Sequence, residues 1–160
     1  MIKVKLLCVG KLKEKYLLSA QEEYTKRLSS LCKLEIEEIP ESRLPDDPGS
    51  AEIEIALKKE AEVILEKIPK NSYTVAMCIE GQQLDSVQLA DKISSLAVSG
   101  SGSLCYIIGG SYGIYESVKK EADMRLSMSK MTFPHHLARI MLLEQIYRSF
   151  KINEGSRYHK

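Results

Sequence analysis

Apolar and polar positions recur along the chain with two different periods, and these periods predict its secondary structure. Alternating or continuous apolar runs predict strands over residues 2–9, 34–39, 73–79, 104–108 and 124–128. Apolar residues three or four positions apart predict helices over residues 16–31, 53–68, 87–97, 114–122 and 135–152. The segment 40–49, which is rich in proline, is predicted to be a surface loop.

The order of these elements predicts an α/β fold. Strands alternate with helices, which is typical of a mostly parallel sheet with helices on both faces. The strand over 34–39 has one apolar and one charged face, so we expect it near a sheet edge. The sequence shows no internal repeat, low-complexity segment or domain boundary, so residues 1–160 are expected to form a single domain.

The composition argues against membrane-spanning, secreted, disulfide-rich and zinc-binding proteins. No apolar run approaches the roughly 20 residues that span a bilayer, and the chain opens with a strand-like segment rather than a signal peptide. The cysteines at positions 8, 32, 78 and 105 form no CxxC pair, so neither a disulfide framework nor a zinc site is expected. We therefore expect a cytoplasmic protein with no metal and no membrane partner.

The net charge of +1 hides an uneven distribution. Residues 1–34 carry 8 basic and 3 acidic side chains, residues 35–66 carry 3 and 11, and residues 135–160 carry 5 and 2. An acidic middle between two basic ends is compatible with a local phosphate-binding face. The alternative is that these charges merely gather on solvated helices.

Three predicted strands end in residues that suit ligand binding. They are followed by Glu80-Gly81, by Gly109–Gly113 and by Ser129–Pro134, and ligands of open α/β sheets bind beyond the carboxyl ends of strands. The glycines match neither the dinucleotide nor the phosphate-loop pattern, so a tight turn explains them equally well. Met131 and Phe133 suit packing against an adenine or a methionyl chain, but they suit the core as well.

The helix predicted over 135–152 carries the most polar candidates. Arg139 and Arg148 are nine residues apart, about 2.5 turns, so they project to opposite sides and should not form one clamp. Glu144 and Arg148 are spaced for a simple salt bridge. The dipole at the helix start disfavours protonation of His135 and His136. The terminal Arg-Tyr-His-Lys run is either a frayed end or a set of groups for phosphate, base and proton.

One combination of segments is more specific than any of these features alone. It comprises residues 9–13, 108–113 and 127–135, Arg139, residues 143–148 and the terminal Tyr158-His159-Lys160. In this combination the chain resembles the ribosomal RNA large subunit methyltransferase H family over its whole length, with matching motif order. The stretch from Ser127 through Arg148, together with the terminal Tyr-His-Lys, is the most specific part.

The resemblance implies a fold, a partner and a reaction. The fold is that of the SPOUT class, in which the C-terminal segment forms a deep trefoil knot, a rare exception to ordinary chain connections. The family forms homodimers with the active site at the subunit interface. It uses S-adenosylmethionine to methylate N3 of pseudouridine 1915 in the helix 69 loop of 23S ribosomal RNA, acting on assembled ribosomes.

The resemblance also implies site residues, carried over by position. The cofactor contacts are Met77, Gly109, Met128, Ser129, Lys130, Met131, Thr132 and Phe133. Tyr158 and His159 of the partner subunit are candidates for handling the imide proton or placing the base. Arg139 and Arg148 are candidates for holding phosphate or the imidate oxygens. Met77 stands where the family often has leucine, a volume-conserving change.

Two other functions deserve comparison with the methyltransferase. A non-catalytic ribosome- or RNA-binding protein that keeps the fold would combine intact glycine loops with a degraded tail, whereas both are intact here. A nucleotide-binding metabolic enzyme would show a phosphate-binding motif or an acidic ribose ligand at the usual spacing, and the sequence contains neither.

Overall fold

The computed structural model describes residues 1–160 and contains one five-stranded sheet with the order β2-β1-β4-β3-β5. The strands are β1 (Lys3–Val9), β2 (Lys33–Ile39), β3 (Tyr73–Gln83), β4 (Ser103–Ile108) and β5 (Met124–Ser127). All neighbouring strands in the sheet are parallel. The predicted parallel α/β architecture is therefore confirmed, and β2 lies at an edge as its charged face indicated.

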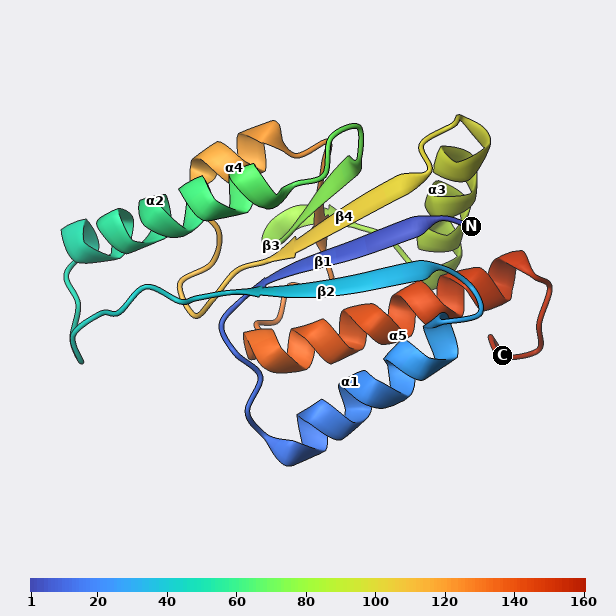
Figure 1. Cartoon of the computed structure of the whole chain (residues 1–160), viewed down its shortest axis with the longest axis horizontal. Helices are drawn as coiled ribbons and strands as arrows, with labels where there is room; N and C mark the ends of the chain where they lie inside the picture. The colour runs from blue at the N-terminus through green and yellow to red at the C-terminus, as the bar shows by residue number, and fades with distance from the viewer.

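Helices cover both faces of the sheet (Figure 1). They are α1 (Lys15–Leu28), α2 (Ser50–Lys67), α3 (Ser86–Val98), α4 (Glu116–Glu121) and α5 (His135–Asn153). α5 packs between α1 and α3 on one face, while α2 and α4 lie together on the other. α3 shows how the local sequence sets a boundary: Asp85 accepts the Gln88 N–H, and the Gln88 side chain accepts the Asp85 N–H.

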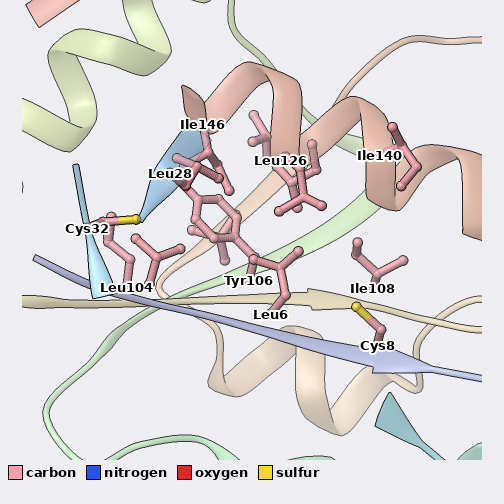
Figure 2. Close-up of a cluster of buried hydrophobic side chains, with 14 of the residues drawn as sticks. Leu6, Cys8, Leu28, Cys32, Leu104, Tyr106, Ile108, Leu126, Ile140 and Ile146 are labelled. Atoms are coloured by element: carbon pink, nitrogen blue, oxygen red, sulfur yellow. The ribbon is translucent and has the colours of Figure 1, made fainter. Parts of the chain in front are cut away.

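The two central strands, β1 and β4, supply residues to a hydrophobic core on each face. Leu6 of β1 and Tyr106 of β4 point toward α5, where they meet Ile146 in the larger core (Figure 2). Leu7 and Ile107, their neighbours in sequence, face the core beneath α2 and α4. Strands buried on both faces appear in the sequence as continuous apolar runs, which is why both were predicted without difficulty.

The end of β3 departs from the prediction. The apolar pattern stops at Ile79, but the strand continues to Gln83 after an irregularity. Met77 and Gln82 both pair with Leu126 of β5, so the four residues between them bulge around that position. This pairing between β3 and β5 is made by backbone atoms. The side chains of Glu80–Gln83 therefore show no pattern that would have predicted it.

All four cysteines are free, and Cys8, Cys32 and Cys105 are buried among apolar side chains. Burial raises the pKa of the Cys8 thiol to about 11, which keeps it protonated and unreactive at neutral pH. These thiols therefore serve as small hydrophobic groups in the core. No helix of the structure has the length and apolar character needed to cross a membrane.

Candidate active site

A cavity of about 930 Å³ opens at the carboxyl ends of β3, β4 and β5. Its walls come from three segments that follow these strands and from the start of α5. They are Met77–Glu80, the glycine loop Gly109–Gly113 and the loop 128–134, which we call the closing loop. The three strand ends that the sequence singled out thus meet at one place, as expected for an open parallel sheet.

Seven of the eight expected cofactor contacts line this cavity. They are Met77, Gly109, Met128, Ser129, Met131, Thr132 and Phe133. Lys130 is exposed and is not among the residues that line the cavity. Met131 is 73% exposed and therefore lies at the mouth rather than in the interior.

The glycine loop is folded tightly against itself. The Gly113 N–H donates to the Gly110 carbonyl at 3.1 Å, and Gly113 has a φ of 85°, which side chains rarely tolerate. A Cβ on Gly109 would collide with the carbonyl oxygen of Gly113. The loop is thus a tight turn, and its tightness brings bare backbone up to the cavity.

The closing loop is held by Ser127, the last residue of β5, and by its own Ser129. The buried Ser127 hydroxyl donates to the Ser129 carbonyl at 2.9 Å, and the Met131 N–H donates to the Ser129 hydroxyl at 3.0 Å. The backbone N–H groups of Thr132 and Phe133 donate to no other group of the protein. Two backbone donors beside an apolar cavity can bind the acceptor atoms of a heterocycle.

His135 and His136 begin α5 with their ring centroids 4.2 Å apart. The Nε2 atoms of both rings are buried and make no hydrogen bond within the protein. Burial, reinforced by the neighbouring His136, lowers the pKa of His135. The expected direction is therefore found, although burial rather than the helix dipole is its main cause. His135 also lines the cavity.

Arg139 is enclosed by the fold and does not line the cavity. Its side chain is 1% exposed. Nη1 donates to Glu38 at 2.9 Å and to Gln21 at 3.1 Å, while Nη2 donates to the Gly10 carbonyl at 3.2 Å. Arg139 therefore ties α5 to α1 and to the ends of β1 and β2. Sequence spacing gave no sign of these partners, which lie more than 100 residues away.

Arg148 belongs to a second group of polar side chains, which we call the tail cluster: Glu144, Arg148, Tyr158 and His159. The Nη2 of Arg148 donates to Glu144 at 2.7 Å, so the predicted salt bridge is present. The Tyr158 hydroxyl donates to the same carboxylate at 3.1 Å, and His159 Nδ1 lies 3.2 Å from Nη1 of Arg148. The structure therefore gathers three of the four expected catalytic residues and leaves Arg139 apart.

The tail cluster does not line the cavity of its own chain. Ala138 is the last residue of α5 in the lining, and Arg148 follows ten residues later. Ten residues of helix correspond to roughly 15 Å along the axis. As the spacing along the helix predicted, Arg139 and Arg148 do not form one clamp, because they contact different partners.

Glu80 was singled out by the sequence analysis as part of a strand end, but Lys119, its charged partner at the cavity, was missed. Glu80, at the end of β3, forms an ion pair with Lys119 of α4, and both line the cavity. That ion pair lowers the pKa of Glu80. The two residues are 39 positions apart in the sequence. They meet only because α4 packs beside β3, so no local pattern predicts this ion pair. No group of three or more His, Cys, Asp or Glu side chains could hold a metal ion.

Comparisons with known proteins agree with this arrangement. Residues 2–159 match the family model described as predicted SPOUT methyltransferase. In solved structures, a probable methyltransferase from Bordetella pertussis superposes with a TM-score of 0.59 at 12% identity, covering 93% of this chain and 96% of that one. A probable methylase family protein from Haemophilus influenzae superposes with a TM-score of 0.55, covering 100% and 72%. These structures support the fold.

The chain has a parallel α/β fold with a cavity at the strand ends, and the SPOUT methyltransferase family model matches nearly all of its residues. The chain therefore belongs to the SPOUT family of methyltransferases. The names of its curated relatives are more specific than the name of the family. The chain is 50% identical over 157 residues to ribosomal RNA large subunit methyltransferase H of Clostridioides difficile, covering 98% of this chain and 99% of the relative. It is 45% identical over 159 residues to the protein of the same name from Streptococcus suis, covering 99% and 100%.

Proposed function

We propose that this enzyme transfers a methyl group from S-adenosylmethionine to N3 of pseudouridine 1915 in the helix 69 loop of 23S ribosomal RNA, on assembled ribosomes in the cytoplasm. The observation that carries the proposal is the cavity, whose lining contains Met77, Gly109 and most of the closing loop. The names of the relatives that are 45–50% identical support the ribosomal RNA substrate. The whole chain, residues 1–160, acts as one domain in this proposal.

The cavity fits the chemistry of the methyl donor. Its volume of about 930 Å³ is within the range for small-molecule sites, roughly 300–1,000 Å³. Ile108, Met128 and Phe133 offer apolar surface to an adenine ring. The free N–H groups of Thr132 and Phe133 offer donors to its ring nitrogens. The sulfonium compound, when bound, supplies an activated methyl group.

The residues of the chain must then orient the nucleobase and remove a proton. The N3 of pseudouridine carries an imide proton, so a base or a nearby cation must assist its departure. Tyr158 and His159 handle that proton or place the base in this proposal, and Arg148 stabilises the charge on the imidate oxygens. Arg139, enclosed by Glu38 and Gly10, acts instead by holding the ends of β1 and β2 in place.

The distance between the cavity and the tail cluster supports a homodimer. Because the cluster does not line its own cavity, a second subunit must present its tail there for the proposed chemistry to occur. A deletion of Tyr158–Lys160 and a cavity variant, Gly109→Trp, should each be inactive alone. Random exchange of subunits makes half the dimers mixed, each with one complete site, so a mixture should recover about a quarter of wild-type activity. A mixture that stays inactive contradicts the shared site.

The path of the chain around Leu126 supports the deep C-terminal knot. Within β3, residues 78–81 bulge out of the pairing with β5. Met77 before the bulge and Gln82 after it both pair with Leu126. The bulge therefore passes closely around β5, the strand that leads into α5. In this proposal β5 and α5 thread through that part of the chain, as in the SPOUT class.

Two measurements test the function. Calorimetry should detect S-adenosylmethionine binding to the purified protein, and ribosomes that lack the modification should then acquire one methyl group in its presence. Mass mapping of ribosomal RNA from cells without the protein should show loss of a single methyl mark in the helix 69 loop. If every methyl mark remains, the proposed substrate is wrong, and binding without turnover would indicate a non-catalytic RNA-binding protein.

A further inference from the structure

The loop between β2 and α2 reaches the glycine loop through one side chain. Oε1 of Glu41 accepts the Ser111 N–H at 3.2 Å. The same oxygen lies 2.6 Å from the position where a Cβ on Gly110 would stand, so the carboxylate rests directly against the glycine backbone. Glu41 itself is outside the cavity, whereas Gly110 and Ser111 both line it. A residue of the predicted surface loop is therefore in direct contact with the outer side of a cavity wall.

The residue after Glu41 is hydrogen-bonded to α2. The N–H of the next residue, Ser42, donates to Glu60 of α2 at 2.9 Å, and the Ser42 hydroxyl donates to the Ala56 carbonyl at 3.2 Å. Glu60 is 6% exposed, which is unusual for a carboxylate without a cationic partner. Burial raises the pKa of Glu60. These bonds hold the loop to α2 and present Glu41 in one place.

The other carboxylate oxygen faces the start of α5. A Cβ built on Gly10 would lie 3.5 Å from Oε2 of Glu41 and 3.3 Å from the Nε2 atoms of both His135 and His136, so these three atoms converge above Gly10. That nitrogen of His135 is buried and has no hydrogen-bond partner. Because His135 also lines the cavity, Glu41 touches one wall and approaches another.

We propose that Glu41 is a positioning residue for the cofactor cavity, which fixes the glycine loop at a set distance from the start of α5. The proposal rests on the proposed function, since it takes this cavity as the site of the methyl donor. A loop outside the sheet opens readily unless something holds it. A hydrogen bond from a backbone N–H to a carboxylate is among the stronger ones available for that purpose.

The effect should appear in cofactor affinity rather than in the chemical step. Glu41→Ala leaves the Ser111 N–H without its acceptor and frees the glycine loop, so the Kd for S-adenosylmethionine should rise about fivefold. The kcat at saturating donor should change less than about twofold, because the ordered loop is recovered once the donor is bound. Glu41→Gln keeps an acceptor oxygen for Ser111 and should restore the Kd to within about twofold of wild type.

Hydrogen exchange tests the same contact without the cofactor. In the unliganded protein, the peptide that contains Gly110 and Ser111 should exchange faster in Glu41→Ala than in wild type. Asp47→Asn is the matched control, because Asp47 is an exposed carboxylate of the same loop that makes no hydrogen bond or ion pair. It should leave both the exchange and the Kd unchanged.

The outcomes separate this inference from the function on which it rests. If Glu41→Ala matches Asp47→Asn in hydrogen exchange and in Kd, Glu41 does not position the loop. If wild-type protein fails to bind S-adenosylmethionine, the proposed function falls. The difference in exchange between the two variants then still decides whether Glu41 holds the glycine loop.

Discussion

Gly81 lies against the backbone of Leu126 so closely that a Cβ on residue 81 would come within 2.7 Å of the Leu126 carbonyl carbon. The bulged end of β3 passes over β5 at this point, next to the cavity. Glycine is needed here because of the space available rather than because of an unusual φ. The close crossing fixes where β5 ends and where the closing loop begins.

Replacing Gly81 with alanine should therefore destabilise the protein. Neither backbone can move without disturbing the sheet, so we expect the free energy of unfolding to fall by about 2–4 kcal/mol. Urea denaturation of the variant measures this loss. Gly102→Ala is the control, since a Cβ there meets nothing within 4 Å, and its stability should change by less than about 0.5 kcal/mol. Equal stability of the two variants would contradict the close crossing.

Arg139→Ala should impair the protein through its fold. The substitution leaves the Gly10 carbonyl without its donor and removes the guanidinium from Glu38, which keeps only the Leu12 N–H. Because Glu38 is 35% exposed, unfolding should become easier by about 2–3 kcal/mol. Denaturation in urea, followed by circular dichroism, provides the measurement. Arg43→Ala, an exposed arginine of the loop after β2, should have little effect. A stable but inactive Arg139→Ala protein would instead indicate direct contact with substrate.

His135 should make stability depend on pH. Burial and His136 lower its pKa in the folded state, while the nearby carboxylates of Glu41 and Glu14 partly oppose that shift. The unfolded chain therefore takes up a proton near pH 6.5 that the folded protein resists. The stability contributed by neutral His135 is complete above about pH 6.5 and is lost as the pH falls toward the folded pKa.

The His135→Gln variant tests this dependence. Urea denaturation at about pH 7.5 and about pH 5 should show a larger loss of stability for wild type than for His135→Gln. His159→Gln, which changes a histidine of the tail instead, should keep the wild-type difference. If His135→Gln loses as much stability as wild type between these two conditions, His135 is not the titrating group.

Tyr158→Phe should separate binding from chemistry. The substitution removes the hydroxyl that donates to Glu144 at 3.1 Å and loosens the tail cluster. Because the proposed function assigns Tyr158 to the nucleobase rather than to the methyl donor, the affinity for S-adenosylmethionine should stay within about twofold of wild type, while kcat falls about tenfold. Calorimetry and a ribosome methylation assay measure the two quantities. Tyr16→Phe, at a 72% exposed position, should alter neither, and full turnover by Tyr158→Phe would remove this hydroxyl from the mechanism.

Much of the fold was accessible from local patterns. The buried runs of β1 and β4, the charged face of β2 and the stripe of α5 are properties of a few neighbouring residues, and each predicts its element directly. The sequence also predicted that Met77, Gly109 and the closing loop would lie close together, because the carboxyl ends of parallel strands share one edge of the sheet. Periodicity and strand direction were sufficient for these conclusions.

Other features depend on pairs of residues far apart in the chain, and no local pattern specifies them. Arg139 meets Glu38 across 101 positions, and Glu41 meets Ser111 across 70. Such contacts arise only when the strand order places β2 and the glycine loop beside α5. An arginine or a glutamate has the same appearance in a sequence whether it faces solvent, a substrate or a buried partner. Only the packed molecule shows that Arg139 is enclosed, and that neither Lys130 nor the tail cluster lines the cavity.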